Sequence, residues 1–128
     1  MDKKIQKRVI TKIEKQGSLI NDQIAKFGYH VGVKVNCELE TIADGNVVFG
    51  FCPMEYLHEF VHEKYLTVSL PCSDYLSMND ENFAEFIQQF IKIVLFAEDW
   101  GVSCQEAYRM MTTYNLEMDN VSNSKCSW

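Results

Sequence analysis

Long apolar runs are missing from this 128-residue sequence, and the longest covers only residues 93–97. A helix that spans a bilayer needs about 20 apolar residues, so we expect no membrane segment. A secretory signal is also missing, because the lysines at positions 3, 4 and 7 lead into an amphipathic pattern and not into a continuous apolar segment. These two absences predict a cytoplasmic protein.

The cysteines offer no sign of a disulfide framework or of a cysteine zinc site. Their number is odd, and no two of them have the spacing Cys-x-x-Cys. We therefore expect reduced thiols that serve as small apolar core residues, as in cytosolic proteins. The five cysteines are Cys37, Cys52, Cys72, Cys104 and Cys126.

Two catalytic signatures are also absent, namely a Gly-rich phosphate loop and a G-x-S-x-G nucleophile turn. The apolar content of 47% and the aromatic content of 12% exclude a disordered chain. A chain of this length suits a single core. We predict one domain over residues 1–120 and a flexible polar tail over residues 121–128, which ends in the unexplained aromatic Trp128.

The net charge of −6 is unevenly distributed along the chain. Residues 1–35 contain eight Lys and Arg residues against three Asp and Glu residues, a balance of +5, whereas residues 36–128 contain four against fifteen, a balance of −11. An acidic surface repels phosphates and attracts basic partners. We therefore expect no direct nucleic-acid binding, and we interpret the basic N-terminal helix as a solvated face.

The first half of the chain changes from a helical to an alternating pattern at about residue 31. Apolar residues at helical spacing predict helices up to Gly28, which is placed to end them. Residues 31–42 then alternate apolar and polar side chains, as in a half-buried strand. The turn signal Asp44-Gly45 leads to residues 47–52, which are apolar on both faces and should lie nearer the sheet centre.

The second half is dominated by helical signals. Pro53 is a good first helical residue, and the spacing of apolar residues predicts a helix over 54–65. A short strand over 67–70 and a polar loop over 72–77 should follow. Asn79 can cap a strongly apolar helix over 80–99, which we expect to be the central core helix. The capping box formed by Ser103 and Glu106 predicts one more helix.

The fold class that follows is α+β. We predict an N-terminal helix, a small antiparallel sheet of two or three strands, and C-terminal helices packed on one face of this sheet.

The sharpest chemical pattern is H-E-x-x-H, which runs from His58 to His62 with Glu59 after the first histidine. On a helix, this spacing places both imidazoles on one side, where they can share a metal ion. Glu59 would then be the general base of a zinc hydrolase, and Glu81 or Glu85 would supply the third ligand. An amphipathic helix with two surface histidines has the same pattern.

Two further pieces follow this pattern, Glu-Asn-Phe-Ala at residues 81–84 and Trp-Gly-Val-Ser at residues 100–103. Together with the preceding helix and hairpin, their order resembles the metallopeptidases that cleave phage-type repressors, often called ImmA/IrrE. The resemblance covers residues 12–115. It implies zinc held by His58, His62 and Glu81, with Glu59 as the base and a repressor as the substrate.

The charge distribution favours a different function, a non-enzymatic interaction protein without a cofactor. Such a protein would mask a basic, nucleic-acid-handling surface of a protein partner, as an immunity protein or a phage inhibitor of a host defence nuclease does. The compact zinc metallopeptidase is the alternative. The predicted contact residues are acidic, and they are Glu38, Glu40, Asp44, Glu55, Glu59 and Glu63.

Overall fold

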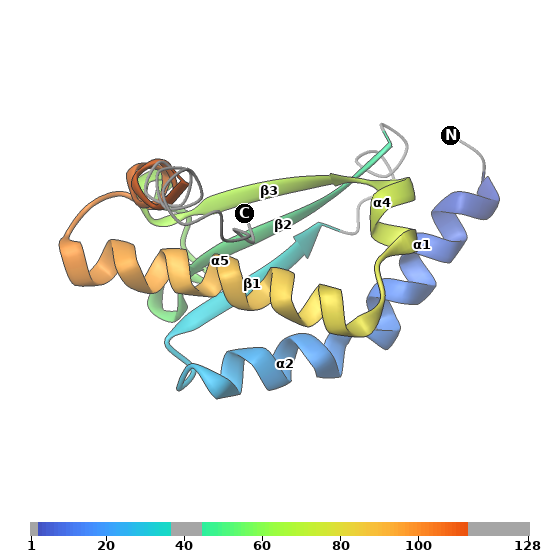
Figure 1. Cartoon of the computed structure of the whole chain (residues 1–128), viewed down its shortest axis with the longest axis horizontal. Helices are drawn as coiled ribbons and strands as arrows, with labels where there is room; N and C mark the ends of the chain where they lie inside the picture. Colours follow the sequence, from blue (N-terminus) through green and yellow to red (C-terminus); the bar gives the residue numbers. More distant parts are fainter. Residues whose placement is uncertain (1–2, 37–44, 113–128) are drawn as a thin grey trace, which may run out of the picture.

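The computed structural model describes residues 3–36 and 45–112 (Figure 1). The fold is α+β, as predicted, with a three-stranded antiparallel sheet and helices packed against it. Cys37, Cys126 and the predicted tail over residues 121–128 lie outside the described residues. The elements are α1 (Lys3–Lys15), α2 (Gly17–Lys26), β1 (Val31–Asn36), β2 (Asn46–Pro53), β3 (Leu66–Pro71), α4 (Cys72–Ser77), α5 (Asp80–Trp100) and a last helical segment at 104–112.

The sheet has the order β1-β2-β3, so β2 is its central strand, as its apolar sequence predicted. Val35, Phe49 and Val68 are aligned across the three strands and therefore point to the same face. This inner face carries the hydrophobic core. On the other face the aligned residues are Lys34, Gly50 and Thr67, which are small or polar.

An aromatic cluster joins β2 to α5 and forms the centre of the core. The side chains of Phe49 and Phe51 are fully buried, and each packs edge-on against the ring of Phe86. The ring of Phe51 also stacks on that of Phe90, with the ring centroids 5.4 Å apart. Aromatic pairs of this kind each contribute about 1 kcal/mol beyond the burial of their area. The prediction of a central core helix is thus confirmed.

The ends of α5 follow the signals in its sequence. The side chain of Asn79 accepts a hydrogen bond from the backbone N–H of Asn82, 2.8 Å away. At the other end Gly101 has φ 65°, a left-handed conformation that favours glycine. Although α5 has 21 residues, neither it nor any other helix in the described part of the chain is long and apolar enough to cross a membrane.

The predicted loop over residues 72–77 is wrong, because these residues form the short helix α4. Tyr75 of α4 is fully buried, and its hydroxyl donates to Oε1 of the buried Gln16 over 2.7 Å. The Nζ of Lys12 donates to the carbonyls of Tyr75 and Met78 at the end of the helix. Contacts with α1, which lies far away in the sequence, therefore stabilise a segment whose own residues are mostly polar.

The Lys12 side chain is more buried than its position on a basic helix suggested. Burial lowers the pKa of its amine, and the nearby carboxylate of Asp80 opposes this shift. The same polar contact region includes Gln16, whose Nε2 donates to Oδ1 of Asp80 over 3.3 Å. Lys12 is thus a structural residue that fixes α4 against α1.

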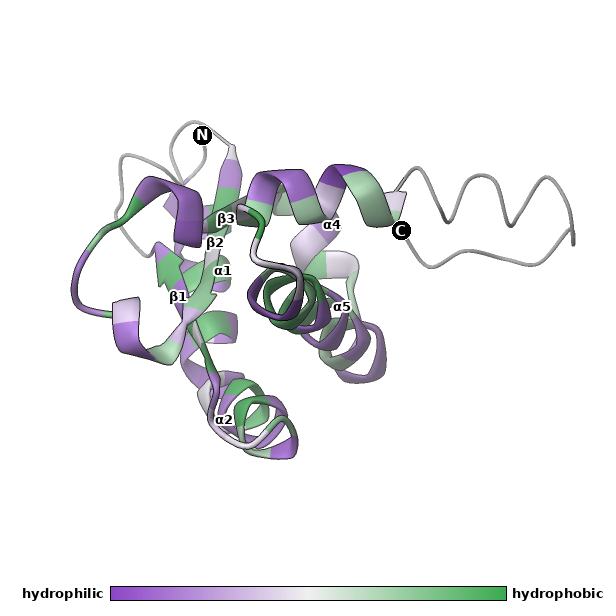
Figure 2. Cartoon of the chain, turned by 90° about the vertical axis from the view of Figure 1, so that its left-hand side faces the viewer, coloured by the Kyte–Doolittle hydropathy of each residue, from purple (hydrophilic) through white to green (hydrophobic). Residues whose placement is uncertain are grey.

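Residues 54–65 lie on the outer side of the sheet, opposite α5, and we call this segment the β2–β3 connection (Figure 2). Its Leu57 occupies the space beside Gly32 of β1, where an added Cβ would lie 2.6 Å from Leu57 Cδ1. A side chain at position 32 would therefore displace Leu57. Gly50 on β2 has no such neighbour, because the nearest atom to an added Cβ is 3.9 Å away.

We expect Gly32→Ala to lower the free energy of unfolding by about 1 kcal/mol, because the Leu57 side chain must move and lose its contact with β1. Gly50→Ala is the matched control and should be neutral or slightly stabilising, because glycine in a strand costs about 0.5–1 kcal/mol relative to alanine. Urea unfolding measures both effects. If Gly32→Ala costs just as much in a Leu57→Ala background, Leu57 is not the cause.

Candidate docking surface

The β2–β3 connection is not a helix, so the prediction of a helix over 54–65 is wrong. It contains two short 3-10 turns, at Met54–Tyr56 and His62–Lys64. Between them the backbone is irregular, and Val61 is extended, with φ −127° and ψ 113°. The two histidines of the H-E-x-x-H pattern are therefore not one helical turn apart.

Side chains hold this connection in place of helical hydrogen bonds, one from Tyr65 at its own end and one from Gln105 in the last helical segment. The hydroxyl of Tyr65, a buried residue, donates to the carbonyls of Tyr56 and Leu57 over 2.5 and 3.3 Å. Gln105 Nε2 donates to the carbonyls of His62 and Tyr65 over 3.2 and 2.8 Å. A continuous helix would use such carbonyls for its own backbone bonds. Tertiary contacts thus override the helical pattern of the sequence.

The structure does not assemble the zinc ligands of the alternative hypothesis. Lys64 at the end of the connection pairs with Glu98, which lies near the C-terminal end of α5. Glu81 is at the N-terminal end of the same helix, about 25 Å away at 1.5 Å per residue. Glu85 is only about 6 Å nearer. A zinc ligand must lie about 2 Å from the ion, so neither carboxylate can join His58 and His62.

No group of three His, Cys, Asp or Glu residues within 3–36 and 45–112 has a geometry that could hold a metal ion. Glu59 is exposed on the irregular part of the connection and lies beside no such group. The geometry therefore gives the predicted general base no metal-bound water to deprotonate.

The β2–β3 connection and the end of α5 together form an acidic surface, which we call the acidic end. The ion pair between Lys64 Nζ and Glu98 Oε1, 3.2 Å long, joins the two segments. All its carboxylates are exposed, and it faces the viewer in Figure 2. The members of this surface are Glu55, Glu59, Glu63, Glu98 and Asp99.

The carboxylates of Glu98 and Asp99 lie where a helix least favours negative charge. They occupy the last turn of α5, which contains no basic residue. The partial negative charge at a helix C-terminus disfavours each such carboxylate by about 0.3–1 kcal/mol. The ion pair with Lys64 offsets this cost for Glu98, and a positively charged ligand would also offset it for Asp99.

Exposed aromatic side chains accompany the acidic end. Phe60 on the connection is 70% exposed, and Trp100 at the end of α5 is 66% exposed. Phe60 packs on the rings of Tyr65 and His62, and Trp100 stacks on that of Phe96. Neither residue was predicted to be functional, because Phe60 belongs to the apolar stripe of the predicted 54–65 helix and Trp100 follows a predicted helix end.

The predicted contact residues Glu38, Glu40 and Asp44 lie outside the described residues. Asn36 and Gly45, which flank them, lie at one end of the sheet, where Asn36 is aligned with Val48. The acidic end adjoins Pro53, at the opposite end of the eight-residue strand β2 and about 25 Å away. Of the predicted contact residues, Glu55, Glu59 and Glu63 are those that the structure describes, and all three are exposed on the β2–β3 connection.

The described cysteines are not arranged as nucleophiles. Cys52, Cys72 and Cys104 are free and buried, as predicted. Burial raises the pKa of each thiol, and that of Cys104 rises to about 11. The Sγ of Cys104 donates to the carbonyl of Lys64. These thiols therefore act as packing groups.

Comparisons of the chain with protein-family models, with curated proteins and with solved structures give no match. The resemblance to the repressor-cleaving metallopeptidases thus gains no support from them, and the absence of the H-E-x-x-H helix removes its main structural requirement. The function must be inferred from the surface itself.

We expect metal chelation to leave the melting temperature unchanged, because His58 and His62 have no third ligand within reach among the residues that the structure describes. The measurement is thermal unfolding of protein that carries no histidine tag, with and without EDTA, together with metal analysis. His58→Ala and His62→Ala should behave like the wild type in both assays. One equivalent of bound zinc that is lost on His58→Ala would contradict this geometry.

We expect the three buried thiols to resist modification in the folded protein. At pH 8 a thiol with a pKa of about 11 is ionised in only about one molecule in a thousand. The test is reaction of the Cys37→Ser/Cys126→Ser variant with an aromatic disulfide reagent, since this variant keeps only Cys52, Cys72 and Cys104. Rapid reaction without denaturant would show that these thiols are accessible. Reaction in guanidinium chloride provides the control.

Proposed function

We propose that this protein is a non-enzymatic interaction protein that masks a basic, nucleic-acid-handling surface of a protein partner. The acidic end is the proposed contact surface, with Glu55, Glu59 and Glu63 at its centre. The observation that carries the proposal is the exposure of these three carboxylates on one connection, beside the exposed ring of Phe60.

Charge complementarity supports a basic partner. Within the described residues 45–112 there are ten Asp and Glu residues and three Lys and Arg residues, a balance of −7. Two of these three cations, Lys64 and Arg109, are already paired with Glu98 and Glu106. A protein with such a field would be steered toward a positive surface and would approach it faster at low salt.

The exposed aromatic residues supply the second half of a protein-binding surface. Charged groups at the rim of an interface mainly affect the association rate and specificity, whereas buried aromatic anchors supply most of the affinity. Phe60 and Trp100 are large, and each is held by a ring contact, so little conformational entropy is lost when they become buried. The combination suits a protein surface better than a small cation.

The negative charge of the acidic end is best matched by a protein surface that binds nucleic acid. Such surfaces concentrate Lys and Arg to neutralise phosphates. A row of carboxylates can occupy those cations and displace the nucleic acid by direct competition. This is how an immunity protein or an inhibitor of a defence nuclease would act with no catalytic group of its own.

We expect the triple variant Glu55→Lys/Glu59→Lys/Glu63→Lys to lose the partner. The measurement is capture from extract of the source cell, analysed by mass spectrometry at about 50 and 500 mM salt, because screening weakens contacts between exposed charges. A partner retained by the wild type should be a basic protein, and the wild type should inhibit its nucleic-acid binding or cleavage.

The matched control is Asp74→Lys/Glu81→Lys/Glu85→Lys, which changes the net charge equally at three exposed positions on α4 and α5 away from the acidic end. This control should retain the partner. Equal capture by both triple variants, or capture that does not depend on salt, would refute the proposed contact surface.

A further inference from the structure

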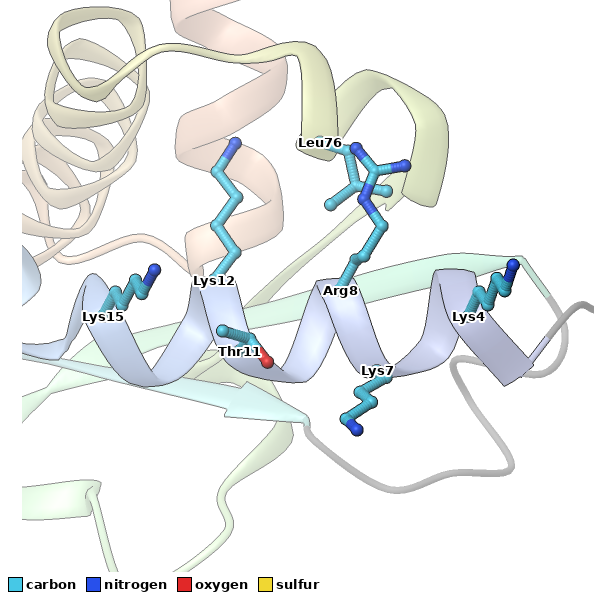
Figure 3. A pocket seen from close by; sticks show the side chains of 7 residues that line it. All are labelled: Lys4, Lys7, Arg8, Thr11, Lys12, Lys15 and Leu76. Carbon is cyan, nitrogen blue, oxygen red and sulfur yellow. The ribbon is translucent and has the colours of Figure 1, made fainter.

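A second charged surface lies on α1, at the other end of the sheet from the acidic end. A surface cavity of about 600 Å³ lies between α1 and α4, and Figure 3 shows the side chains that line it. Four of its cationic side chains recur at helical spacing along α1, from Lys4 to Lys15, over about 16 Å. The lining residues are Lys4, Lys7, Arg8, Thr11, Lys12, Lys15 and Leu76.

Three of these cations take part in no ion pair among the residues that the structure describes. Lys12 is committed to the carbonyls at the end of α4. In contrast, Lys7, Arg8 and Lys15 are exposed and form no ion pair with any residue that the structure describes. The first turn of α1 contains no acidic residue to offset its lysines. Repulsion among these like charges is therefore a cost that an anionic ligand would remove.

The cavity continues into a second hollow of about 430 Å³ that shares Arg8 and Leu76 with it. This part adds the apolar side chain of Ile5 and the hydroxyls of Ser73 and Ser77. The two hollows form one groove between α1 and α4. Its cations lie along one wall, and apolar and hydroxyl-bearing side chains form the rest of its lining.

We propose that this groove binds an acidic peptide segment of a protein partner, with an apolar side chain of the segment seated on Leu76 and Ile5. Carboxylates on that segment pair with Arg8 and Lys15, whereas the side chain of Lys7 points away from α4 (Figure 3). The guanidinium of Arg8, where the two hollows meet, can bind a carboxylate in a bidentate geometry. The surface is distinct from the acidic end, since Gly45 lines the groove and lies about 25 Å from Pro53 along β2.

The surroundings of the groove favour a peptide over a nucleic acid. Single-stranded nucleic acids stack their bases on exposed aromatic rings. The large exposed hydrophobic residues of the described structure are Tyr29, Phe60, Trp100 and Tyr108, and none of them lines the groove. The net charge of −6 also opposes the approach of a long polyanion. A short acidic peptide avoids most of this repulsion.

The test uses the full chain and a fluorescein-labelled synthetic peptide of about five Glu-Glu-Leu repeats, with binding measured by fluorescence anisotropy at about 50 mM salt. A Glu-Glu-Gly peptide of equal length tests the apolar contact, and a single-stranded oligonucleotide of similar length tests the nucleic-acid alternative. We expect the Glu-Glu-Leu peptide to bind at least about tenfold more tightly than either probe.

Arg8→Glu should weaken binding of the Glu-Glu-Leu peptide by about tenfold or more, because it removes a cation and adds a repulsive carboxylate. Lys92→Glu is the matched control, since it makes the same charge change at an exposed position on α5 outside the groove, and it should change the affinity less than about twofold. Both positions are exposed, so both variants should fold, which circular dichroism can verify.

Three outcomes would overturn the proposal. One is equal loss of affinity in Arg8→Glu and Lys92→Glu, which would show a non-specific charge effect. Another is equal or tighter binding of the oligonucleotide, which would identify a nucleic-acid surface. The third is salt-sensitive self-association of the free protein that Arg8→Glu abolishes, because the occupant would then be the acidic end of a second copy. If the groove proposal fails, the acidic end can still pass the capture experiment, because that experiment tests a different surface.

Discussion

The packing of α5 on the central strand β2 is the contact on which the rest of the structure depends. Phe49 and Phe51 present their rings on one face of the sheet, and Phe86 lies against both of them. This contact fixes the axis of a 21-residue helix relative to the strands. Because the helix is about 30 Å long, both of its ends are then positioned at once.

Each end of α5 carries a different part of the surface. At its N-terminal end, Asp80 meets Gln16 and so joins α5 to the α1–α4 region. At its C-terminal end, Glu98 pairs with Lys64 and so joins α5 to the β2–β3 connection. The basic groove and the acidic end are therefore held apart by one rigid element. This separation prevents the two opposite charges from neutralising each other within one molecule.

The parts of the fold that local chemistry determines could be predicted from the sequence. The side chain of Asn79 and the flexibility of Gly101 act within one turn of α5, so the ends of this helix follow from its own residues. The alternation of β1 and the two-sided apolar character of β2 likewise predicted a half-buried strand and a strand near the sheet centre. For these elements, local preference and tertiary packing agree.

Two segments were predicted wrongly, because distant residues determine their structure. The apolar spacing of the β2–β3 connection is helical, but the distant Gln105 binds its carbonyls and Leu57 packs beside Gly32 of β1. The sequence of α4 is polar, but the burial of Tyr75 and the bonds from Lys12 make it helical. The aromatic part of the candidate site was missed for a related reason, because the sequence alone does not show whether Phe60 is exposed.

The way in which the β2–β3 connection is anchored has a consequence for its motion. Its carbonyls are bound by a few side chains and by isolated backbone bonds of its short turns, whereas the strands on either side of it belong to a continuous ladder of hydrogen bonds. Release of the Tyr65 hydroxyl and the Gln105 amide would free this segment while Phe49, Phe51 and α5 stay packed. Amide hydrogens of the connection should therefore exchange with solvent through local opening, at a lower free energy than those of β2. Such a segment can adapt its shape to a partner without any loss of the core.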